Sequence, residues 1–233
     1  MRLLLLLTFL FQVFSIKTVN LTLDNTLLLR GAIDEKSTNK LMYDIEKSNA
    51  TNKILYLDTN GGMVEEGLKI INEVRNYNIS CVAEKAYSMG FSIFQSCYNR
   101  YILPNGKLMQ HQISFGIGGE LAKVNNYVSF IKQIEEEIVE LEASRIDIPI
   151  DTYREMTTNE WWLYGQNIIN SNAADEIVNV KCSNKLTKKN FTIETKKYTY
   201  VYSSCPLISN EIEKKEKKKD VDTSYLEDLF YFI

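Results

Sequence analysis

Short apolar runs and helical patterns alternate along the first half of the chain. Runs rich in Leu, Ile and Val predict strands over residues 21–31, 54–57, 79–83, 101–103 and 107–109. Between them, apolar residues three and four positions apart predict helices over residues 37–47 and 64–75 and in the segment after Ser88. Strands that alternate with helices form βαβ units, so this order predicts an α/β fold on a largely parallel sheet.

A long amphipathic pattern follows over residues 124–144. Its apolar residues recur at three- and four-residue steps, among them Ile131, Ile134 and Ile138, while the acidic run from Glu135 to Glu137 covers the other face. The pattern predicts one long helix whose apolar stripe packs either in the core or against another subunit.

The character of the chain changes after Val180. Residues 191–195 and 198–202 alternate between apolar and polar side chains around two lysines, which predicts a β-hairpin. Residues 211–222 are mostly charged, and the last residues of the chain are apolar. We therefore expect an α/β domain over residues 16–180, a hairpin extension over 181–208, and a charged linker with an apolar tail over 209–233.

The N-terminus has the pattern of a secretory signal peptide. Arg2 precedes an apolar run from Leu3 to Phe14, and Val13 and Ser15 are small enough for a cleavage site after residue 15. The run is shorter than the roughly 20 apolar residues that span a bilayer. The sequence therefore predicts a signal peptide over residues 1–15 and an exported protein, periplasmic or secreted. An uncleaved membrane anchor and a buried first strand are the alternatives.

Composition narrows the classes of function. With 45% hydrophobic and 11% aromatic residues, the chain is expected to fold around a globular core. A formal net charge of -3 gives no electrostatic reason to expect nucleic acid or an anionic membrane as a partner. The four cysteines include no Cys-x-x-Cys pair, which argues against a zinc or redox site, and we expect no metal or cofactor.

Candidate chemistry lies at the ends of predicted strands. Ser88 stands between a strand and a helix, where backbone N–H groups and the helix dipole favour developing negative charge; a serine that only caps the helix is the alternative. Gly61 and Gly62 follow another strand and let backbone N–H groups approach a ligand, although they also suit an ordinary turn. His111 is the only histidine and so the only imidazole base; a structural role is the alternative.

In this order, these segments resemble the proteolytic subunit of the Clp protease family. The matching pieces are the Leu55–Gly62 run, Ser88-Met-Gly90, Leu103-Pro-Asn105 and Met109-Gln-His-Gln112, followed by the long helix. The resemblance implies a ClpP/crotonase-like fold with a handle-like helix and a homo-oligomeric ring. It also implies a serine peptidase in which Ser88 attacks a peptide carbonyl and His111 accepts the serine proton. The backbone N–H groups of Gly62 and Met89 would then form the oxyanion hole.

The same resemblance puts the catalytic acid at Glu160, just before two tryptophans. That position is found by counting back from the turn at Asn172–Asp175, and the family has an aspartate there. A glutamate can also orient an imidazole. Asn159 is the alternative orienter, and a solvated acid without a catalytic role is the other reading of Glu160. Tyr87, which replaces a small residue, would narrow the site or shift the loop.

Export changes the partners that the resemblance implies. Cytosolic family members work with an ATP-driven unfoldase, which an exported protein could not use. We therefore expect ATP-independent cleavage of peptides, unfolded chains or membrane-protein segments. The alternatives are a non-catalytic Clp-like scaffold or binding protein and, third, a crotonase-type acyl-CoA enzyme. A Ser-Lys peptidase that uses Lys85 is disfavoured because the glycine-rich serine motif of such enzymes is missing.

All four cysteines lie after the predicted cleavage site, an even number in an oxidising compartment. Cys81 opens the strand that leads to Ser88, and Cys97 closes the helix that returns from it. A strand of about seven residues covers about 23 Å and a helix of about nine residues about 14 Å, which could bring both cysteines to one end of the unit. Cys182 and Cys205 bracket the predicted hairpin. We therefore expect Cys81–Cys97 and Cys182–Cys205 disulfides.

Overall fold

The structure, a computed structural model, describes residues 16–217 of the 233-residue chain. The predicted signal peptide and the apolar C-terminal tail lie outside the described residues. The chain divides between Lys181 and Cys182 into two compact units, and each is described by itself.

A mixed sheet forms the centre of the first unit. Its strands run in the order β2-β3-β4-β5-β6, and β7 pairs with β5 beside that path. The first four are mutually parallel, β6 is antiparallel to β5, and β7 is parallel to it. The bounds are β2 (Thr26–Ile33), β3 (Ile54–Gly62), β4 (Ser80–Tyr87), β5 (Arg100–Gln110), β6 (Trp161–Tyr164) and β7 (Glu176–Ile177).

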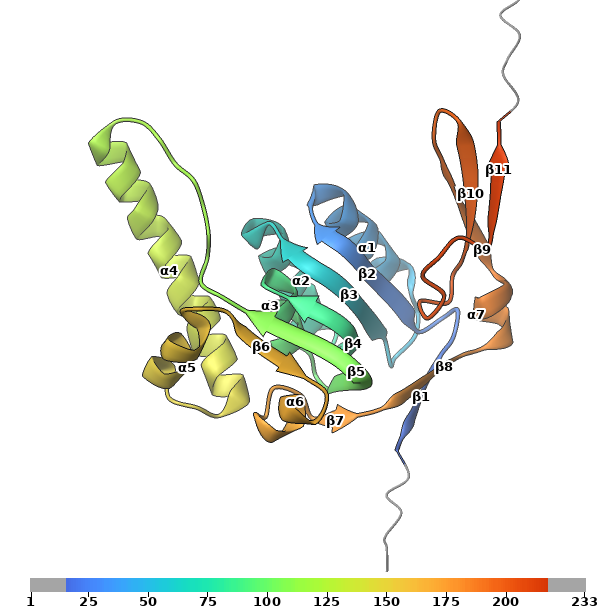
Figure 1. Cartoon of the computed structure of the whole chain (residues 1–233), viewed down its shortest axis with the longest axis horizontal. Helices are drawn as coiled ribbons and strands as arrows, with labels where there is room; N and C mark the ends of the chain where they lie inside the picture. The colour runs from blue at the N-terminus through green and yellow to red at the C-terminus, as the bar shows by residue number, and fades with distance from the viewer. Residues whose placement is uncertain (1–15, 218–233) are drawn as a thin grey trace, which may run out of the picture. The chain divides into compact units, whose positions relative to one another are not determined.

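Three helices connect the parallel strands and cover one face of the sheet (Figure 1). They are α1 (Glu35–Lys47), α2 (Val64–Asn76) and α3 (Met89–Gln95). Asp34 and Ser37 form a capping box that begins α1, with the Ser37 N–H 2.8 Å from Asp34 Oδ1. All seven residues of α3 are buried, so the segment after Ser88 belongs to the core.

The long helix α4 (Leu121–Ile146) lies beyond the β6 edge of the sheet, followed by α5 (Ile150–Thr157) and α6 (Gln166–Asn170) (Figure 1). Only the C-terminal half of α4 contributes buried residues: Ile138, Val139, Glu142, Ala143 and Ile146. One of these five, Glu142, carries a carboxyl group, and it returns below as part of the candidate active site.

A buried arginine fastens the middle of the unit. Arg100, at the start of β5, has a side chain only 3% exposed and lies 2.5 Å from Asp175 Oδ1 through its Nη2 atom. Its Nη1 atom also donates to Gln95 Oε1 at 2.6 Å and to the Asn172 carbonyl at 3.0 Å. These bonds join α3, β5 and the turn before β7, so Arg100 holds the C-terminal end of α3 in place.

The remaining described elements are short. β1 (Thr18–Leu21) pairs with β8 (Asn179–Cys182) in a two-stranded sheet. The second unit contains α7 (Asn184–Lys188) and a three-stranded sheet of order β11-β10-β9, whose neighbouring strands are antiparallel. Its strands are β9 (Asn190–Glu194), β10 (Tyr198–Ser203) and β11 (Glu213–Glu216).

The α/β class, the largely parallel sheet, the long helix and the C-terminal hairpin are confirmed. Three details differ from the sequence prediction. The strand expected over residues 21–31 is interrupted, because Asn25 Oδ1 accepts the Thr22 N–H at 2.8 Å and closes a turn. The two strands expected around Pro104 are one strand, β5, with a register irregularity where β4 and β5 pair. Part of the charged segment expected as a linker forms β11 and pairs with β10.

Both predicted disulfides are present. Cys81 and Cys97 are joined with their Cα atoms 5.8 Å apart, and Cys182 and Cys205 with theirs 5.9 Å apart. The first connects the start of β4 with the second residue after α3, and the second closes the hairpin unit. The Cys81–Cys97 prediction succeeded because β4 leads the chain away from Cys81 and α3 leads it back, so both cysteines lie at the same end of this βα unit.

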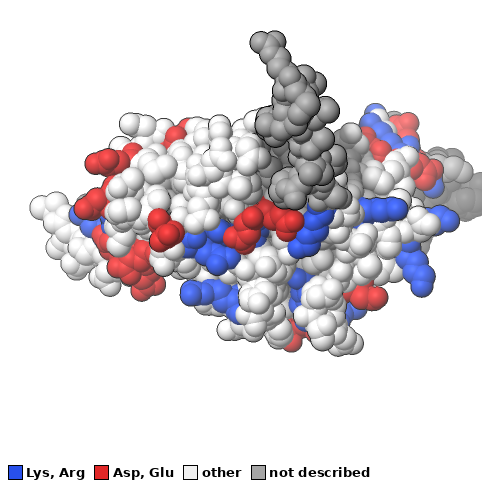
Figure 2. Space-filling model, turned by 90° about the horizontal axis from the view of Figure 1, so that it is seen from below, with Lys and Arg blue, Asp and Glu red and all other residues white. Residues whose placement is uncertain are grey.

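On the face drawn in Figure 2, acidic and basic side chains are interspersed, and neither sign of charge dominates. Among residues 16–217, no helix is both long and apolar enough to cross a membrane.

Candidate active site

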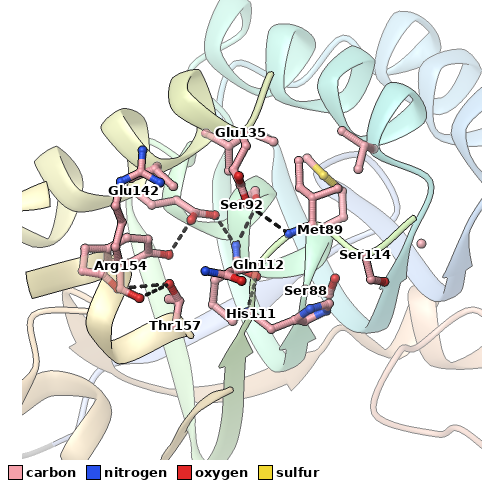
Figure 3. Close-up of a pocket in the computed structure, with 17 residues that line it drawn as sticks. Ser88, Met89, Ser92, His111, Gln112, Ser114, Glu135, Glu142, Arg154 and Thr157 are labelled. Carbon is pink, nitrogen blue, oxygen red and sulfur yellow. Dashed lines mark hydrogen bonds between the residues drawn. The ribbon is translucent and has the colours of Figure 1, made fainter. Parts of the chain in front are cut away.

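The carboxyl ends of three neighbouring parallel strands bring the sequence candidates together. β3 ends at Gly62, Ser88 follows β4, and His111 follows β5. Because neighbouring parallel strands end at the same edge of a sheet, these positions lie side by side. Gly62, Ser88, Met89 and His111 all line one cavity of about 80 Å³ (Figure 3).

Ser88 occupies a strained turn between β4 and α3. Its φ of 53° and ψ of -126° lie in a region that residues other than glycine rarely adopt. Two backbone hydrogen bonds hold it there: its N–H donates to the Met109 carbonyl at 2.8 Å, and its carbonyl accepts from the Phe91 N–H at 2.7 Å. The Ser88 side chain makes no capping hydrogen bond to α3. The structure therefore does not support the interpretation of Ser88 as a simple helix cap.

The glycine pair supports this turn from the neighbouring strand. A Cβ atom on Gly61 would lie 2.7 Å from both Ser88 Cβ and the Tyr87 carbonyl oxygen, and one on Gly62 would lie 2.2 Å from the Ile33 carbonyl oxygen. Both distances are too short for a side chain. Gly61 and Gly62 also continue β3, so they are not an ordinary turn: they let β3 lie directly against β2 and against the Ser88 turn.

His111 is the first residue after β5 and is half-buried. Its backbone N–H donates to Gln110 Oε1 at 3.0 Å. Figure 3 shows its ring on the same side of the cavity as Ser88. Among the hydrogen bonds between residues 16–217, none joins the ring to Ser88 or to a carboxylate, so the two groups share a cavity without a direct bond.

The candidate acid Glu160 and the alternative orienter Asn159 lie outside this cavity. β6 pairs with β5 so that Trp161 is opposite Gln110, and the next step in this register would bring Glu160 alongside His111. Glu160 instead has a φ of 65° and is exposed, and its carboxylate accepts a hydrogen bond from Trp162 Nε1 at 3.0 Å. Asn159 is exposed as well. The structure thus brings Ser88 and His111 together and leaves Glu160 and Asn159 outside the cavity that they line.

Two further residues that the sequence singled out also face away. The Tyr87 ring packs edge to face against Trp162, with ring centroids 5.1 Å apart, so Tyr87 does not narrow the cavity. Lys85 Nζ lies 3.3 Å from Asp58 Oδ1 and is absent from the cavity lining. A lysine base for Ser88 therefore has no support in this geometry.

The Clp protease family model matches residues 13–181 of the chain. The chain belongs to the Clp protease family. The curated relatives that it matches include the ATP-dependent Clp protease proteolytic subunit 2 of Tropheryma whipplei, 25% identical over 158 residues, which are 64% of this chain and 88% of the relative. The corresponding subunit of Streptococcus thermophilus is 25% identical over 166 residues, 66% of this chain and 85% of the relative. Subunit 3 of Streptomyces coelicolor is 33% identical over 129 residues, 50% of this chain and 59% of the relative.

In this member of the Clp protease family, the inner end of the cavity carries a buried carboxyl group that the sequence analysis missed. Glu142 on α4 is 1% exposed and lines the cavity. Its Oε1 atom accepts from Gln110 Nε2 at 2.5 Å, and its Oε2 atom accepts from the Tyr153 hydroxyl. Gln110 Nε2 also donates to Ser92 Oγ at 3.2 Å. Glu142 is thus held by side chains from α5 and β5, and through Gln110 it connects to α3 (Figure 3).

Burial raises the pKa of the Glu142 carboxyl to about 7, although hydrogen bonds from Ser92, Tyr153 and Gln110 oppose that rise. Burial, together with the charge of Glu142, also raises the pKa of the Tyr153 phenol far above its usual value, so Tyr153 remains a hydrogen-bond donor. Both protonation states of Glu142 are therefore accessible near neutral pH.

One signal in the sequence could have identified Glu142. It stands four residues after Ile138 and four before Ile146, in the row of α4 that is apolar at Phe130, Ile134, Ile138 and Ile146. A charged residue among apolar ones either marks a point where the helix is exposed to solvent or is buried with hydrogen-bonding partners. Within residues 16–217, no group of three His, Cys, Asp or Glu side chains is arranged to hold a metal ion.

Proposed function

We propose that this chain is a serine-type peptidase in which Ser88 is the nucleophile and His111 the general base. One observation carries the proposal. The Ser88 hydroxyl, which caps no helix, and the only imidazole of the chain line the same cavity at the ends of adjacent parallel strands. A serine and an imidazole in one cavity provide a nucleophile and a base that can activate it.

In this mechanism Ser88 Oγ attacks the carbonyl carbon of a peptide bond while its proton passes to His111. The oxygen that becomes negative would accept hydrogen bonds from the backbone N–H groups of Gly62 and Met89, which line the same cavity. The N–H of Met89 is the first of α3, and such groups have no acceptor within their helix. His111 then donates the proton to the departing amine, and water releases the acyl group in the second half of the cycle.

Glu160 is our proposed third member, with Asn159 as the alternative. The β5–β6 register, which ends at Gln110 opposite Trp161, supports this choice because one further step would place Glu160 beside His111. To orient the imidazole, the Glu160 carboxylate would have to leave Trp162 Nε1 and turn toward the ring. Formation of the complete triad is therefore a conformational step in this proposal, coupled to substrate binding or to assembly.

We further propose that the protein acts outside the cytoplasm and without ATP. Disulfides persist in oxidising compartments, and the structure has two. The signal peptide predicted over residues 1–15 would take the protein there. Its substrates would then be peptides, unfolded chains or membrane-protein segments, with no ATP-driven unfoldase. The extension over residues 181–208 and the segment after it would flank the catalytic domain.

The exposed apolar side chains near the start of α4 support assembly into a homo-oligomer. Leu121 is 76% exposed and Phe130 47% exposed. Tyr127 lies between the rings of Phe115 and Phe130, with centroid distances of 6.0 and 6.1 Å. Apolar side chains gathered on one exposed surface are typical of a protein interface. A second copy of the chain is our proposed partner.

Labelling with a fluorophosphonate probe tests the catalytic assignment. We expect the wild-type protein, produced with its disulfides, to be labelled, Ser88→Ala to be unlabelled, and His111→Ala to be labelled at least about a hundredfold more slowly. Ser114→Ala is the matched control, because this exposed serine lines the same cavity and should leave labelling unchanged. Labelling that persists in Ser88→Ala would refute the proposed nucleophile.

The acid is tested by Glu160→Gln and Asn159→Ala in the same assay. If Glu160 orients His111, Glu160→Gln should slow labelling about a hundredfold or more, while Asn159→Ala should have little effect. The reverse result would assign the role to Asn159.

A non-catalytic Clp-like scaffold is the second candidate. The observation that favours it is the hydrogen bond that turns Glu160 toward Trp162 instead of His111. An assembled wild-type protein that binds peptides but is never labelled at Ser88 would support the scaffold and exclude the peptidase.

A further inference from the structure

The cavity beside Ser88 extends away from the nucleophile to an inner end formed by α4 and α5. Ser88 and His111 lie at the strand ends, and Glu142 lies on the opposite side of the cavity (Figure 3). Tyr153, which donates to Glu142, also lines the cavity, and both side chains are 1% exposed. A space of about 80 Å³ exceeds the roughly 10 to 15 Å³ that one water needs. The cavity therefore has room for more than one water, or for a small side chain in their place.

The lining of this cavity combines apolar side chains with polar and charged ones, among them Glu135 and Arg154, and Glu142 lies at its inner end. The apolar side chains come from α2, α3, α4 and the segment after β5: Val64, Met89, Ile113, Ile138 and Val139. At the inner end, the Glu142 carboxylate has four acceptor positions, of which Gln110, Tyr153 and Ser92 occupy three. A group that enters the cavity therefore meets an acceptor with remaining capacity.

We propose that Glu142 is a specificity-determining residue that selects the substrate side chain adjacent to the carbonyl attacked by Ser88. This inference rests on the proposed function. The cavity takes a side chain that ends in an uncharged hydrogen-bond donor, such as the amide of asparagine, in preference to an apolar side chain of the same size, such as leucine. The amide N–H group donates to the carboxyl of Glu142, whereas leucine displaces water from that carboxyl and replaces none of its hydrogen bonds.

The expected preference follows from the strength of such bonds. A hydrogen bond to a charged group contributes enough to change an equilibrium constant about ten- to a hundredfold. Gln110 also connects the inner end to the base, since its Nε2 atom donates to Glu142 and its Oε1 atom accepts the His111 N–H at 3.0 Å. A substrate side chain bound at Glu142 would therefore be connected, through Gln110, to the backbone of His111.

Peptide binding measured in the absence of catalysis tests this role. The full chain with Ser88→Ala, in its disulfide-bonded form, is titrated calorimetrically with two acetylated peptides that differ only in ending with asparagine or leucine. We expect the asparagine peptide to bind about ten- to a hundredfold more tightly. Adding Glu142→Met should abolish this ratio, and Glu142→Gln should retain a preference for asparagine. Glu140→Met, an exposed position on the same helix, should leave the ratio unchanged.

Equal affinities of the two peptides for the Ser88→Ala protein, or binding of neither, would overturn the role of Glu142. This comparison needs no change at Glu142, so it does not depend on the folding of Glu142→Met. A ratio that survives Glu142→Met would overturn the proposal as well. Because the nucleophile is absent throughout, the fluorophosphonate experiment tests the peptidase independently: a selective pocket without labelling refutes the catalytic assignment alone.

Discussion

Replacing Glu142 with glutamine should remove a pH dependence of folding stability that the buried carboxyl creates. The pKa of Glu142 rises from an ordinary value of 4.5 to about 7 because burial penalises its charged form. Below about pH 4.5 the group is protonated in both the folded and the unfolded chain, and its contribution to stability is fully present. As pH rises toward 7, the unfolded chain releases this proton while the folded chain retains it, so that contribution is lost.

The size of the effect follows from the change in pKa. A difference of one pKa unit corresponds to about 1.4 kcal/mol, so the rise from 4.5 to about 7 corresponds to about 3 kcal/mol. We expect the free energy of unfolding of the wild-type protein, relative to Glu142→Gln, to decrease by about this amount between about pH 4.5 and pH 8. Above that range the difference should be constant.

Urea unfolding followed by tryptophan fluorescence, at a series of pH values and with both disulfides intact, measures this difference. All other ionisable groups are shared by the two proteins, so their contributions cancel in the difference. Glu140→Gln, at an exposed position of the same helix, is the control and should follow the wild-type curve. If the wild-type and Glu142→Gln curves stay parallel across this pH range, Glu142 does not titrate as a buried group and the reasoning is wrong.

Two further substitutions test how the site is supported. Asp175→Ala would leave Arg100, whose side chain is 3% exposed, without its ion-pair partner; we expect a loss of about 3 to 5 kcal/mol in urea unfolding, and a loss below about 1 kcal/mol would contradict the role of this pair. Gly61→Ala would bring a Cβ within 2.7 Å of the Ser88 side chain, whereas Gly31→Ala, at a similar positive φ, would meet nothing within 4 Å. Both should show a backbone cost of about 1 to 2 kcal/mol, and only Gly61→Ala should also slow fluorophosphonate labelling, so equal labelling of the two variants would count against the contact with Ser88.

Much of the sheet could be predicted because buried parallel strands have a simple pattern. The four apolar residues of Ile54–Leu57 are all buried in the structure, as an unbroken apolar run in a parallel sheet predicts. β5 was harder to predict, because Pro104 and its polar neighbours interrupt the pattern. In the structure the strand continues through them, and the interruption is absorbed as an irregularity of register between Ala83 and Lys85 on β4.

The candidate site could be predicted only in part. Ser88 and His111 follow adjacent parallel strands, so the order of the elements is enough to bring them together. The contacts of Glu142 depend on partners 32 and 11 residues away, and no local pattern specifies them. Glu160 is the opposite case: its place in the chain fits the backbone register, but the direction of its side chain depends on Trp162.

The Cys81–Cys97 disulfide has a consequence for how the nucleophile segment opens. Ser88 lies between the two cysteines, which are 16 residues apart and join the start of β4 to the end of α3. A helix of seven residues has little stability of its own, so α3 depends on its burial against the sheet and on this crosslink. The crosslink ties its far end to a central strand, so that α3, the strained turn and β4 form one cooperative unit. Amide hydrogens across this unit should therefore exchange together, at the rate of the sheet and not at that of a surface helix.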